Sequence, residues 1–186
     1  MSDNKIKFFL NDKKVEAFEN ETIWQAANRL GTEIPHLCYA NKPGYRADGN
    51  CRACMVEVEG ERVLAASCIR KPTNDMKVKT TSNKAKKSRE LVFELLLADQ
   101  PEKKVAHDSN SDFWNWVDKI DLKENRFPKK TPCQSDNSHP SMAVNLDACI
   151  QCNLCVRACR EVQVNDVIGM AYRGEHSKIV FDFDDP

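Results

Sequence analysis

The chain has 186 residues, of which 41% are hydrophobic and 30% are charged, a composition typical of a globular protein. Its 28 basic and 28 acidic residues balance, so net charge gives no indication of a nucleic-acid or anionic-membrane partner. The longest apolar run, residues 95–98, is too short to span a bilayer, and the charged N-terminus lacks the apolar segment of a signal peptide; we therefore expect a cytoplasmic protein.

The first 31 residues predict the opening of a β-grasp fold, in which two strands precede a helix. Residues 5–10 and 14–18 have the composition of two strands joined by a turn. Thr22 is a favourable helix N-cap, Gln25 completes a capping box, and Gly31 provides the stop at the C-terminal end. The predicted apolar face of this helix consists of Ile23, Ala26, Ala27 and Leu30.

A turn-rich loop over residues 35–54 leads to further strands, predicted at 55–59, 62–66 and 76–80. Residues 82–99 then predict the longest helix of the chain. Its predicted apolar face consists of Leu91, Val92, Leu95, Leu96 and Ala98. Its basic residues are Lys84, Lys86, Lys87 and Arg89. No aromatic residues are interleaved with these cations, which favours a solvated helix face over a nucleic-acid contact.

The rest of the chain has weaker secondary-structure signals. Residues 112–117 predict a short helix that packs Trp114 and Trp116, and Trp24 is likewise predicted to be a packing residue. Residues 126–140 contain three prolines and predict an irregular connector, while residues 178–183 predict a final strand.

Nine cysteines are the unusual feature of the composition. They form two groups of four, within residues 38–68 and 149–159, and Cys133 is left over in the connector without a partner at a ligand-like spacing. In a reducing compartment, grouped cysteines of this kind favour metal ligation over disulfides. We therefore expect two metal centres and no ligand role for Cys133.

The first group contains Cys38, Cys51, Cys54 and Cys68, separated by 12, 2 and 13 residues. Plant-type [2Fe–2S] ferredoxins also combine a leading cysteine, a C-x2-C pair and a remote fourth cysteine. Gly44 and Gly49, together with the small Ala53, would let the loop wrap the cluster closely enough for backbone N–H groups to approach the sulfurs.

The alternative for this group is a structural zinc site. Zinc ribbons usually contribute two C-x2-C pairs, and only one is present here, so the spacing favours a [2Fe–2S] cluster. His36 does not indicate a Rieske centre, which needs two histidines, and we expect it to lie in the loop near the cluster edge.

The second group, Cys149, Cys152, Cys155 and Cys159, has the spacing C-x2-C-x2-C-x3-C of bacterial [4Fe–4S] ferredoxins. In two-cluster ferredoxins the fourth cysteine of such a run binds the other cluster. The motif therefore provides either four ligands for one cluster or three for one cluster and one for its neighbour. Arg160 stands where the bacterial run has proline.

Two blocks of the sequence resemble a known family. Residues 38–57, centred on Gly49-Asn50-Cys51-Arg52-Ala53-Cys54, resemble the [2Fe–2S] domain of the alpha subunit of NAD-dependent molybdenum or tungsten formate dehydrogenases. Residues 142–174 resemble the ferredoxin segment that follows in that subunit. The chain resembles more distantly the N-terminal part of the largest iron–sulfur subunit of respiratory NADH dehydrogenase.

The resemblance implies an α+β architecture in three parts. Residues 1–82 would form a β-grasp [2Fe–2S] ferredoxin domain, residues 83–141 a helical and irregular connector, and residues 142–186 half of a bacterial-type [4Fe–4S] ferredoxin domain. The implied cofactors are a [2Fe–2S] cluster and a [4Fe–4S] cluster.

The implied function is electron transfer between a formate-oxidising pterin site and a flavin subunit that reduces NAD. The expected partners are a pterin-binding catalytic region and flavin- and NAD-binding iron–sulfur subunits, without nucleic acid or membrane insertion. The sequence itself offers no catalytic residues and no Gly-rich nucleotide motif, so the chain would be part of an enzyme whose catalytic site lies elsewhere.

Two departures from the family affect the expected clusters. The respiratory relatives hold a further [4Fe–4S] cluster by a histidine and three cysteines after the long helix, and here no cysteine precedes Cys133 in that region. The family also continues with a second C-x2-C-x2-C-x3-C run and a pterin domain, which leads us to expect a truncated segment. In the family Cys159 would serve the second cluster; here it would bind that cluster or act as a local fourth ligand.

Two other functions remain open from the sequence. One is a free-standing ferredoxin-like carrier for a different oxidoreductase, and the other is a zinc-stabilised interaction module. The metal content distinguishes the second from the electron-transfer functions.

Overall fold

The computed structural model describes residues 5–122, 125–131, 135–137, 140–141 and 143–181, and the chain divides into two compact units. The first unit comprises Met1–Tyr39 and Ala47–Val92, and the second comprises Ala40–Arg46 and Phe93–Pro186. Cys133, expected to have no ligand role, lies outside the described residues, as do residues 182–183 of the predicted last strand.

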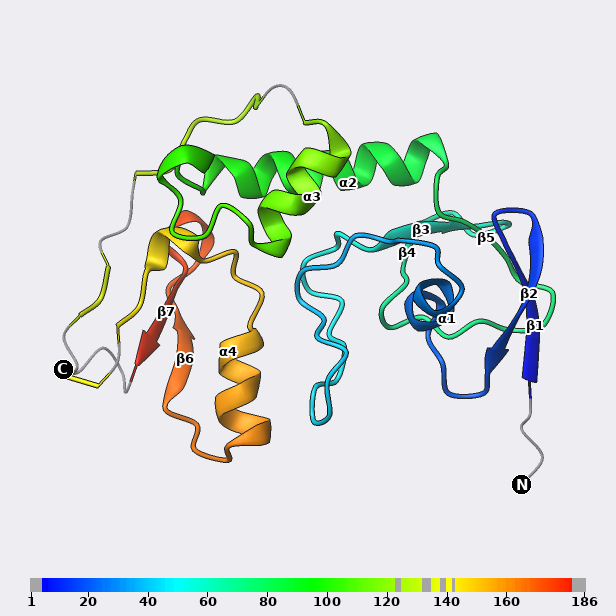
Figure 1. Ribbon diagram of the computed structural model, residues 1–186, viewed down its shortest axis with the longest axis horizontal. Helices are drawn as coiled ribbons and strands as arrows, with labels where there is room; N and C mark the ends of the chain where they lie inside the picture. The colour runs from blue at the N-terminus through cyan, green and yellow to red at the C-terminus, as the bar shows by residue number, and fades with distance from the viewer. Residues whose placement is uncertain (1–4, 123–124, 132–134, 138–139, 142, 182–186) are drawn as a thin grey trace. The chain divides into compact units, whose positions relative to one another are not determined.

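Over the described residues, the first unit is built on a mixed sheet of five strands. Figure 1 labels these strands. Its strands are β1 (Lys5–Leu10), β2 (Lys13–Phe18), β3 (Met55–Val58), β4 (Ala65–Ala66) and β5 (Lys77–Lys79). The strand order is β2-β1-β5-β3-β4; β1 and β5 are parallel and the other pairs antiparallel. This is the β-grasp arrangement that the sequence predicted, and the first unit is a small α+β ferredoxin-like domain.

The β1–β2 hairpin is fixed by a two-residue turn. Asn11 and Asp12 both adopt left-handed backbone conformations, with φ of 49° and 66°, as a tight hairpin turn of the primed type requires. Phe8 and Leu10 point into the core while their neighbours are more exposed, so the period of two sets which face of β1 is buried. Asn11 Oδ1 also accepts a hydrogen bond, at 2.8 Å, from the backbone N–H of Thr80 next to β5.

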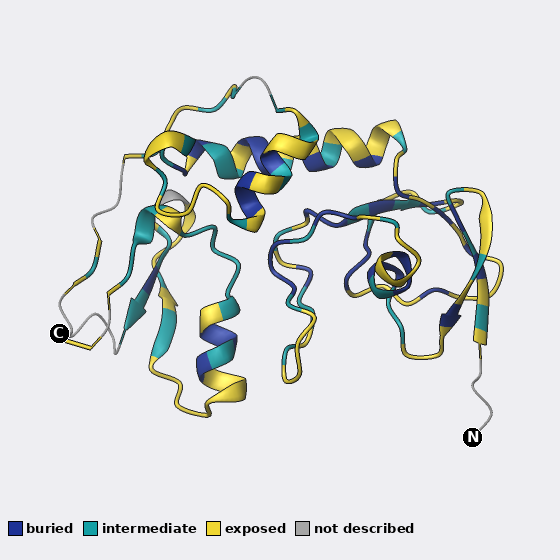
Figure 2. Cartoon of the chain, viewed as in Figure 1, coloured by how far each residue is buried: buried dark blue, intermediate teal, exposed yellow. Residues whose placement is uncertain are grey.

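Helix α1 (Ile23–Arg29) packs one side into the first unit, as its buried and exposed residues show in Figure 2. The predicted capping box is confirmed: Thr22 Oγ1 accepts from the N–H of Gln25 at 3.2 Å, and the Gln25 side chain accepts from the N–H of Thr22 at 2.9 Å. Gly31 has φ of +77° and ends the helix as predicted. Leu30, predicted on the apolar face, is 43% exposed at the C-cap, and Trp24 is buried instead.

The strand predicted at residues 62–66 is shorter than expected. Ala65 and Ala66 pair with β3. The chain turns tightly after Val58, and Val63, inside the predicted strand, is 61% exposed. The carbonyl of Arg62 accepts a hydrogen bond from Lys84 Nζ at 2.7 Å rather than from a neighbouring strand.

Helix α2 (Asn83–Ala98) begins in the first unit and ends in the second. The helix was predicted, but its buried face was assigned incorrectly in part: Leu91 and Leu95 are 41% and 47% exposed, whereas Ala98 is buried as predicted. The side chains of α2 that are buried belong to Ala85, Arg89, Phe93, Glu94 and Ala98. Arg89 and Glu94 can be buried because each has hydrogen-bond partners, which a pattern of apolar residues alone does not reveal.

The second unit contains short helices and one two-stranded sheet. Its regular elements are α3 (Asp112–Ile120), α4 (Leu154–Arg157), the π-helical turn η3 (Ala158–Val162), β6 (Ile168–Ala171) and β7 (Lys178–Phe181). Single 3-10 turns are η1 (Lys103–Val105), η2 (Leu146–Ala148) and η4 (Gly174–His176). Strands β6 and β7 are antiparallel; β7 was predicted, whereas β6 was missed because its four residues, IGMA, include a glycine and give only a weak strand pattern.

Helix α3 confirms the packing role predicted for its aromatic residues. Phe113 stacks on Phe93 of α2 with ring centroids 6.0 Å apart, and Trp114 is 5% exposed. Trp116 is half-buried, and the ammonium group of Lys119 lies 4.8 Å from its ring centroid. Over the described residues, no helix combines the length and apolar character needed to cross a membrane.

Candidate metal centres

The first cysteine group gathers in the first unit from three loops. Cys38 follows α1, Cys51 and Cys54 precede β3, and Cys68 follows β4. Cys38, Cys54 and Cys68 are each 1% exposed, and Cys51 is half-buried. Residues far apart in the sequence therefore place four thiols at one end of the sheet.

The four thiols are arranged as two hydrogen-bonded pairs. Contact with the Cys51 thiol raises the pKa of Cys38, while the same contact lowers the pKa of Cys51 to about 5. The second pair behaves in the same way, because the Cys54 thiol raises the pKa of Cys68 and contact with Cys68 lowers the pKa of Cys54 to about 7. The thiolate is the form of cysteine that binds metal.

Backbone N–H groups point at the sulfurs of the first pair. The N–H of Cys51 donates to Cys38 Sγ at 3.3 Å. Hydrogen bonds to the backbone of Ala53, Cys38 and Leu37 also lower the pKa of Cys51. Such N–H···S contacts are what an iron–sulfur cluster requires of the surrounding backbone, so the chemistry of this loop fits a [2Fe–2S] cluster.

The chain turns sharply between these ligands. Arg52 has φ of 60°, and Ala53 is fully buried. Gly49 has φ of +61°, and a Cβ atom there would lie 3.1 Å from Ile69 Cδ1, so Gly49 serves the close packing predicted for this loop. Gly44 was expected to serve the same loop, but it belongs to the second unit, where a Cβ would lie 3.3 Å from Val162 Cγ2.

Ser67 was not predicted as a site residue but it holds the Cys54 segment in place. Its hydroxyl donates to the carbonyl oxygen of Cys54 at 2.7 Å and its N–H donates to the same oxygen at 3.2 Å, although the side chain is fully buried. A serine next to a ligand-spaced cysteine carries no recognisable sequence signal.

His36, two residues before Cys38 in the sequence, belongs to a group of aromatic rings. Its ring centroid is 4.4 Å from that of Trp24 and 6.5 Å from that of Tyr39. Trp24 Nε1 donates to the carbonyl of Ile34 at 3.0 Å, and Gln25 Nε2 donates to the Tyr39 hydroxyl at 2.9 Å. These contacts fix the loop that carries Cys38 to the first turn of α1.

The pairing of the thiols bears on the zinc alternative. A tetrahedral zinc site needs its donors to converge on one point. In the described parts of the chain, no three Cys, His, Asp or Glu side chains form a set that could hold one metal ion. A [2Fe–2S] cluster would take two of the four thiols at each of its two iron atoms.

The second cysteine group lies around the start of α4. The loop turns through left-handed conformations at Gln151 and Asn153, with φ of 52° and 61°. Burial raises the pKa of Cys152, and negative charge on Cys149 raises it further. Burial also raises the pKa of Cys155, and so do charges on Cys152 and Cys149. These three thiols are thus close enough to interact with one another.

Cys159 has surroundings of its own on η3. It is 7% exposed, and Sγ accepts a hydrogen bond from the N–H of Val167 at 3.3 Å. Cys149 Sγ accepts from the N–H of Gln151 at 3.4 Å. Backbone donors therefore reach sulfurs in the second group as well, and a π-helical turn carries the fourth cysteine.

A cavity of about 990 Å³ in the second unit opens beside Cys149. Gln151 and Ser177 both line it, and Gln151 Nε2 donates to the carbonyl of Ser177 at 3.2 Å. Behind Cys149, Gln100 Nε2 donates to its carbonyl oxygen at 3.2 Å. The first cysteine of the run is thus anchored to a residue just after α2, and its loop is anchored to the segment before β7.

Comparisons with known proteins agree with the first site. Residues 3–83 match the family described as a 2Fe-2S iron-sulfur cluster binding domain. Over 177 residues, 94% of its length, the chain is 31% identical to an NADH-quinone oxidoreductase subunit of Rickettsia typhi. It is 33% identical, over 172 residues and 89% of its length, to NADP-reducing hydrogenase subunit HndD of Solidesulfovibrio fructosivorans.

The match to these relatives is partial on their side. The chain spans 26% of the Rickettsia protein and 29% of the Solidesulfovibrio protein. Among solved structures, a chain of NAD+-reducing [NiFe]-hydrogenase in the H2-reduced state has a TM-score of 0.81 and 25% identity; the match covers 95% of this chain and 74% of the hydrogenase chain. Residues 3–83 thus match a 2Fe-2S iron-sulfur cluster binding domain, and the chain is similar to an NADH-quinone oxidoreductase subunit, to an NADP-reducing hydrogenase subunit and to a chain of an NAD+-reducing hydrogenase.

Proposed function

We propose that this chain is an iron–sulfur electron-transfer module of an NAD(H)-linked oxidoreductase complex. The observation that carries the proposal is the arrangement of four buried or half-buried thiols as two hydrogen-bonded pairs inside the 2Fe-2S domain. The cluster supplies one-electron chemistry, and the chain supplies ligation, burial and hydrogen bonds to sulfur.

In this proposal Cys38, Cys51, Cys54 and Cys68 are the ligands of the [2Fe–2S] cluster. Ser67 fixes the backbone of Cys54, and the N–H of Cys51 reaches the sulfur of Cys38.

Cys149, Cys152 and Cys155 are proposed ligands of a [4Fe–4S] cluster in the segment 142–186. Their mutual electrostatic influence supports this assignment. Cys159, with its separate N–H···S contact, is proposed to bind a second [4Fe–4S] cluster, or otherwise to act as the local fourth ligand.

We further propose that the partners are a formate-oxidising pterin region and flavin- and NAD-binding iron–sulfur subunits, in the cytoplasm. The sequence blocks at residues 38–57 and 142–174 support the formate assignment. A hydrogen-oxidising partner is the second candidate, favoured by the likeness to HndD and to the NAD+-reducing hydrogenase chain.

The metal content tests the core of the proposal. We expect the anaerobically purified chain to contain iron and acid-labile sulfide, and dithionite reduction to produce electron paramagnetic resonance (EPR) signals of both a [2Fe–2S] and a [4Fe–4S] cluster. Stoichiometric zinc with no iron would instead support an interaction module. A [2Fe–2S] signal alone would leave the second cysteine group without its proposed role.

The electron donor is tested in the native complex. Under anaerobic conditions, formate or hydrogen is added separately and the EPR signals of this subunit are followed. Reduction by formate supports the pterin partner, reduction by hydrogen supports the hydrogenase-type partner, and reduction by NADH alone excludes both donors.

A further inference from the structure

We propose that Arg89 is a positioning residue for the redox chemistry, because its buried charge stabilises the reduced state of the [2Fe–2S] cluster and raises its reduction potential. The inference rests on the proposed ligation by the first cysteine group and goes beyond it by assigning a determinant of potential. Arg89 lies on α2, outside every cysteine motif, and was predicted to be solvated.

The hydrogen bonds of Arg89 place its guanidinium against the backbone of the residue that follows Cys54. Arg89 is 8% exposed, and its Nε and one terminal nitrogen both donate to the carbonyl oxygen of Met55, at 2.9 and 2.7 Å. Met55 is the residue directly after Cys54 and begins β3. Both donors thus fasten α2 to the strand that leads away from a proposed cluster ligand.

The partner of this buried cation is a neutral carbonyl. In the described part of the chain, no carboxylate is within ion-pair distance of Arg89. Burial lowers the pKa of Arg89, and the charge on the Cys54 sulfur opposes this shift. Burying a cation without a counter-ion is energetically costly. The burial of Arg89 therefore indicates that an anion lies nearby.

A [2Fe–2S] cluster held by four thiolates meets this requirement. The assembly is anionic, and one-electron reduction adds a further negative charge to it. A fixed cation at short range in a low-dielectric interior stabilises the reduced form more than the oxidised form. The net charge around a cluster is one of the recognised determinants of its potential.

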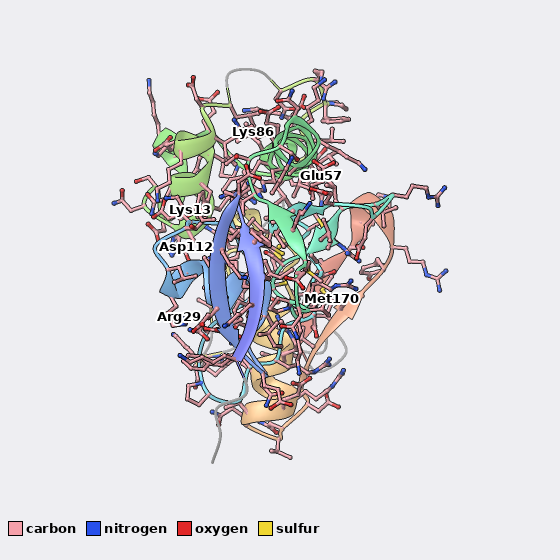
Figure 3. All side chains as sticks on the ribbon, turned by 90° about the vertical axis from the view of Figure 1, so that its right-hand side faces the viewer. Lys13, Arg29, Glu57, Lys86, Asp112 and Met170 are labelled. Atoms are coloured by element: carbon pink, nitrogen blue, oxygen red, sulfur yellow. The ribbon has the colours of Figure 1, made fainter. Side chains whose placement is uncertain are left out.

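Two variants separate charge from hydrogen bonding. Arg89→Gln keeps an N–H donor for Met55 but removes the charge, and Arg89→Lys keeps the charge but loses the forked donor geometry. Lys86→Gln is the matched control, since Lys86 is an exposed cation on the same helix, labelled in Figure 3. Solvent screening should make its influence on the cluster small.

The measurement is an EPR-monitored redox titration of the [2Fe–2S] signal in the full chain. For Arg89→Gln we expect the equilibrium constant for one-electron reduction to fall by about tenfold, equivalent to about 59 mV toward more negative potential. Arg89→Lys and Lys86→Gln should each change this constant by less than about threefold, if the buried charge sets the effect.

A wild-type potential in Arg89→Gln, with normal iron content, would overturn the inference while leaving the proposed function intact. Absence of a [2Fe–2S] signal in the wild-type chain would instead reject the proposed function. If Arg89→Gln assembles no cluster, Arg89→His provides the test at pH 8.5, where an unperturbed imidazole is neutral. A potential below that of the wild type then supports the inference, and an equal potential overturns it.

Discussion

Individual residues in the first unit fix the backbone of the loops that carry the cysteines. Ser67 satisfies a buried carbonyl with its hydroxyl, and Arg52 adopts a left-handed turn between the C-x2-C cysteines. Among the glycines of the first unit, Gly49 has the least space for a side chain, because its φ is positive and a Cβ atom would lie close to Ile69. The consequence can be tested by comparing it with Gly60, which has φ of +85° and where a Cβ would meet no atom within 4 Å.

We expect Gly49→Ala to destabilise the first unit more than Gly60→Ala. Both substitutions carry the cost of alanine in a left-handed conformation, about 1–2 kcal/mol, but only Gly49→Ala also crowds Ile69, for about 1 kcal/mol more. Anaerobic thermal unfolding followed by visible absorbance of the [2Fe–2S] cluster measures the difference. Equal losses in the two variants would show that Ile69 moves aside without cost.

At the scale of elements, a buried carboxylate on α2 binds a residue of the later chain. Arg126 donates to Glu94 from its backbone N–H at 2.7 Å and from its guanidinium at 2.8 and 2.7 Å. The Glu94 side chain is 6% exposed and that of Arg126 is 70% exposed. The hydrogen bonds from Arg126 lower the pKa of Glu94 to about 2, from an ordinary value of 4.5.

The lowered pKa of Glu94 determines how the stability of the fold changes with pH. The folded state favours the ionised carboxylate of Glu94. The contribution of this group to the free energy of unfolding is therefore fully present above about pH 4.5 and is lost as the pH falls toward about 2. We expect Glu94→Gln to accelerate hydrogen exchange of the Arg126 amide by about tenfold at pH 7, since the amide loses a charged acceptor. The difference from the wild type should shrink only below about pH 4.5.

The control for this prediction is Glu90→Gln, which removes an exposed carboxylate from the same helix. Its exchange rate at Arg126 should match the wild type. An equal acceleration in Glu90→Gln would mean that general charge on α2, rather than the Glu94 contact, protects the amide.

At the scale of the whole molecule, each cysteine group belongs to a compact unit of its own. Cys38, Cys51, Cys54 and Cys68 lie in the first unit, and Cys149, Cys152, Cys155 and Cys159 lie in the second. Each unit has its own sheet, with five strands in the first and two in the second. The loss of one proposed cluster should therefore leave the other unit folded.

We expect Cys51→Ser to abolish the [2Fe–2S] EPR signal and to leave the [4Fe–4S] signal largely intact. Cys152→Ser should have the reciprocal effect. Spin quantification with iron and sulfide counts on the two variants provides the measurement. Loss of both signals in either variant would show that the two units assemble as one.

Local sequence was sufficient to determine the first hairpin, the capping box of α1 and the spacing of both cysteine groups. These features depend on turn residues, caps and ligand spacing, whose chemistry acts within a few residues. The same reasoning misplaced the buried face of α2 and missed the short β6. Both depend on partners distant in the sequence, Met55 and Arg126 for α2 and the residues of β7 for β6.

Only the tertiary structure decided how the cysteines and their supporting residues come together. Spacing indicated that Cys38, Cys51, Cys54 and Cys68 form a group, but the pairing of Cys38 with Cys51 and of Cys54 with Cys68 follows from the three loops that meet at the end of the sheet. The burial of Arg89 against the backbone of Met55 likewise required the packing of α2 against β3. A sequence pattern specifies which groups can bind metal, whereas the charges and N–H groups that surround the sulfurs come from segments that only folding brings near.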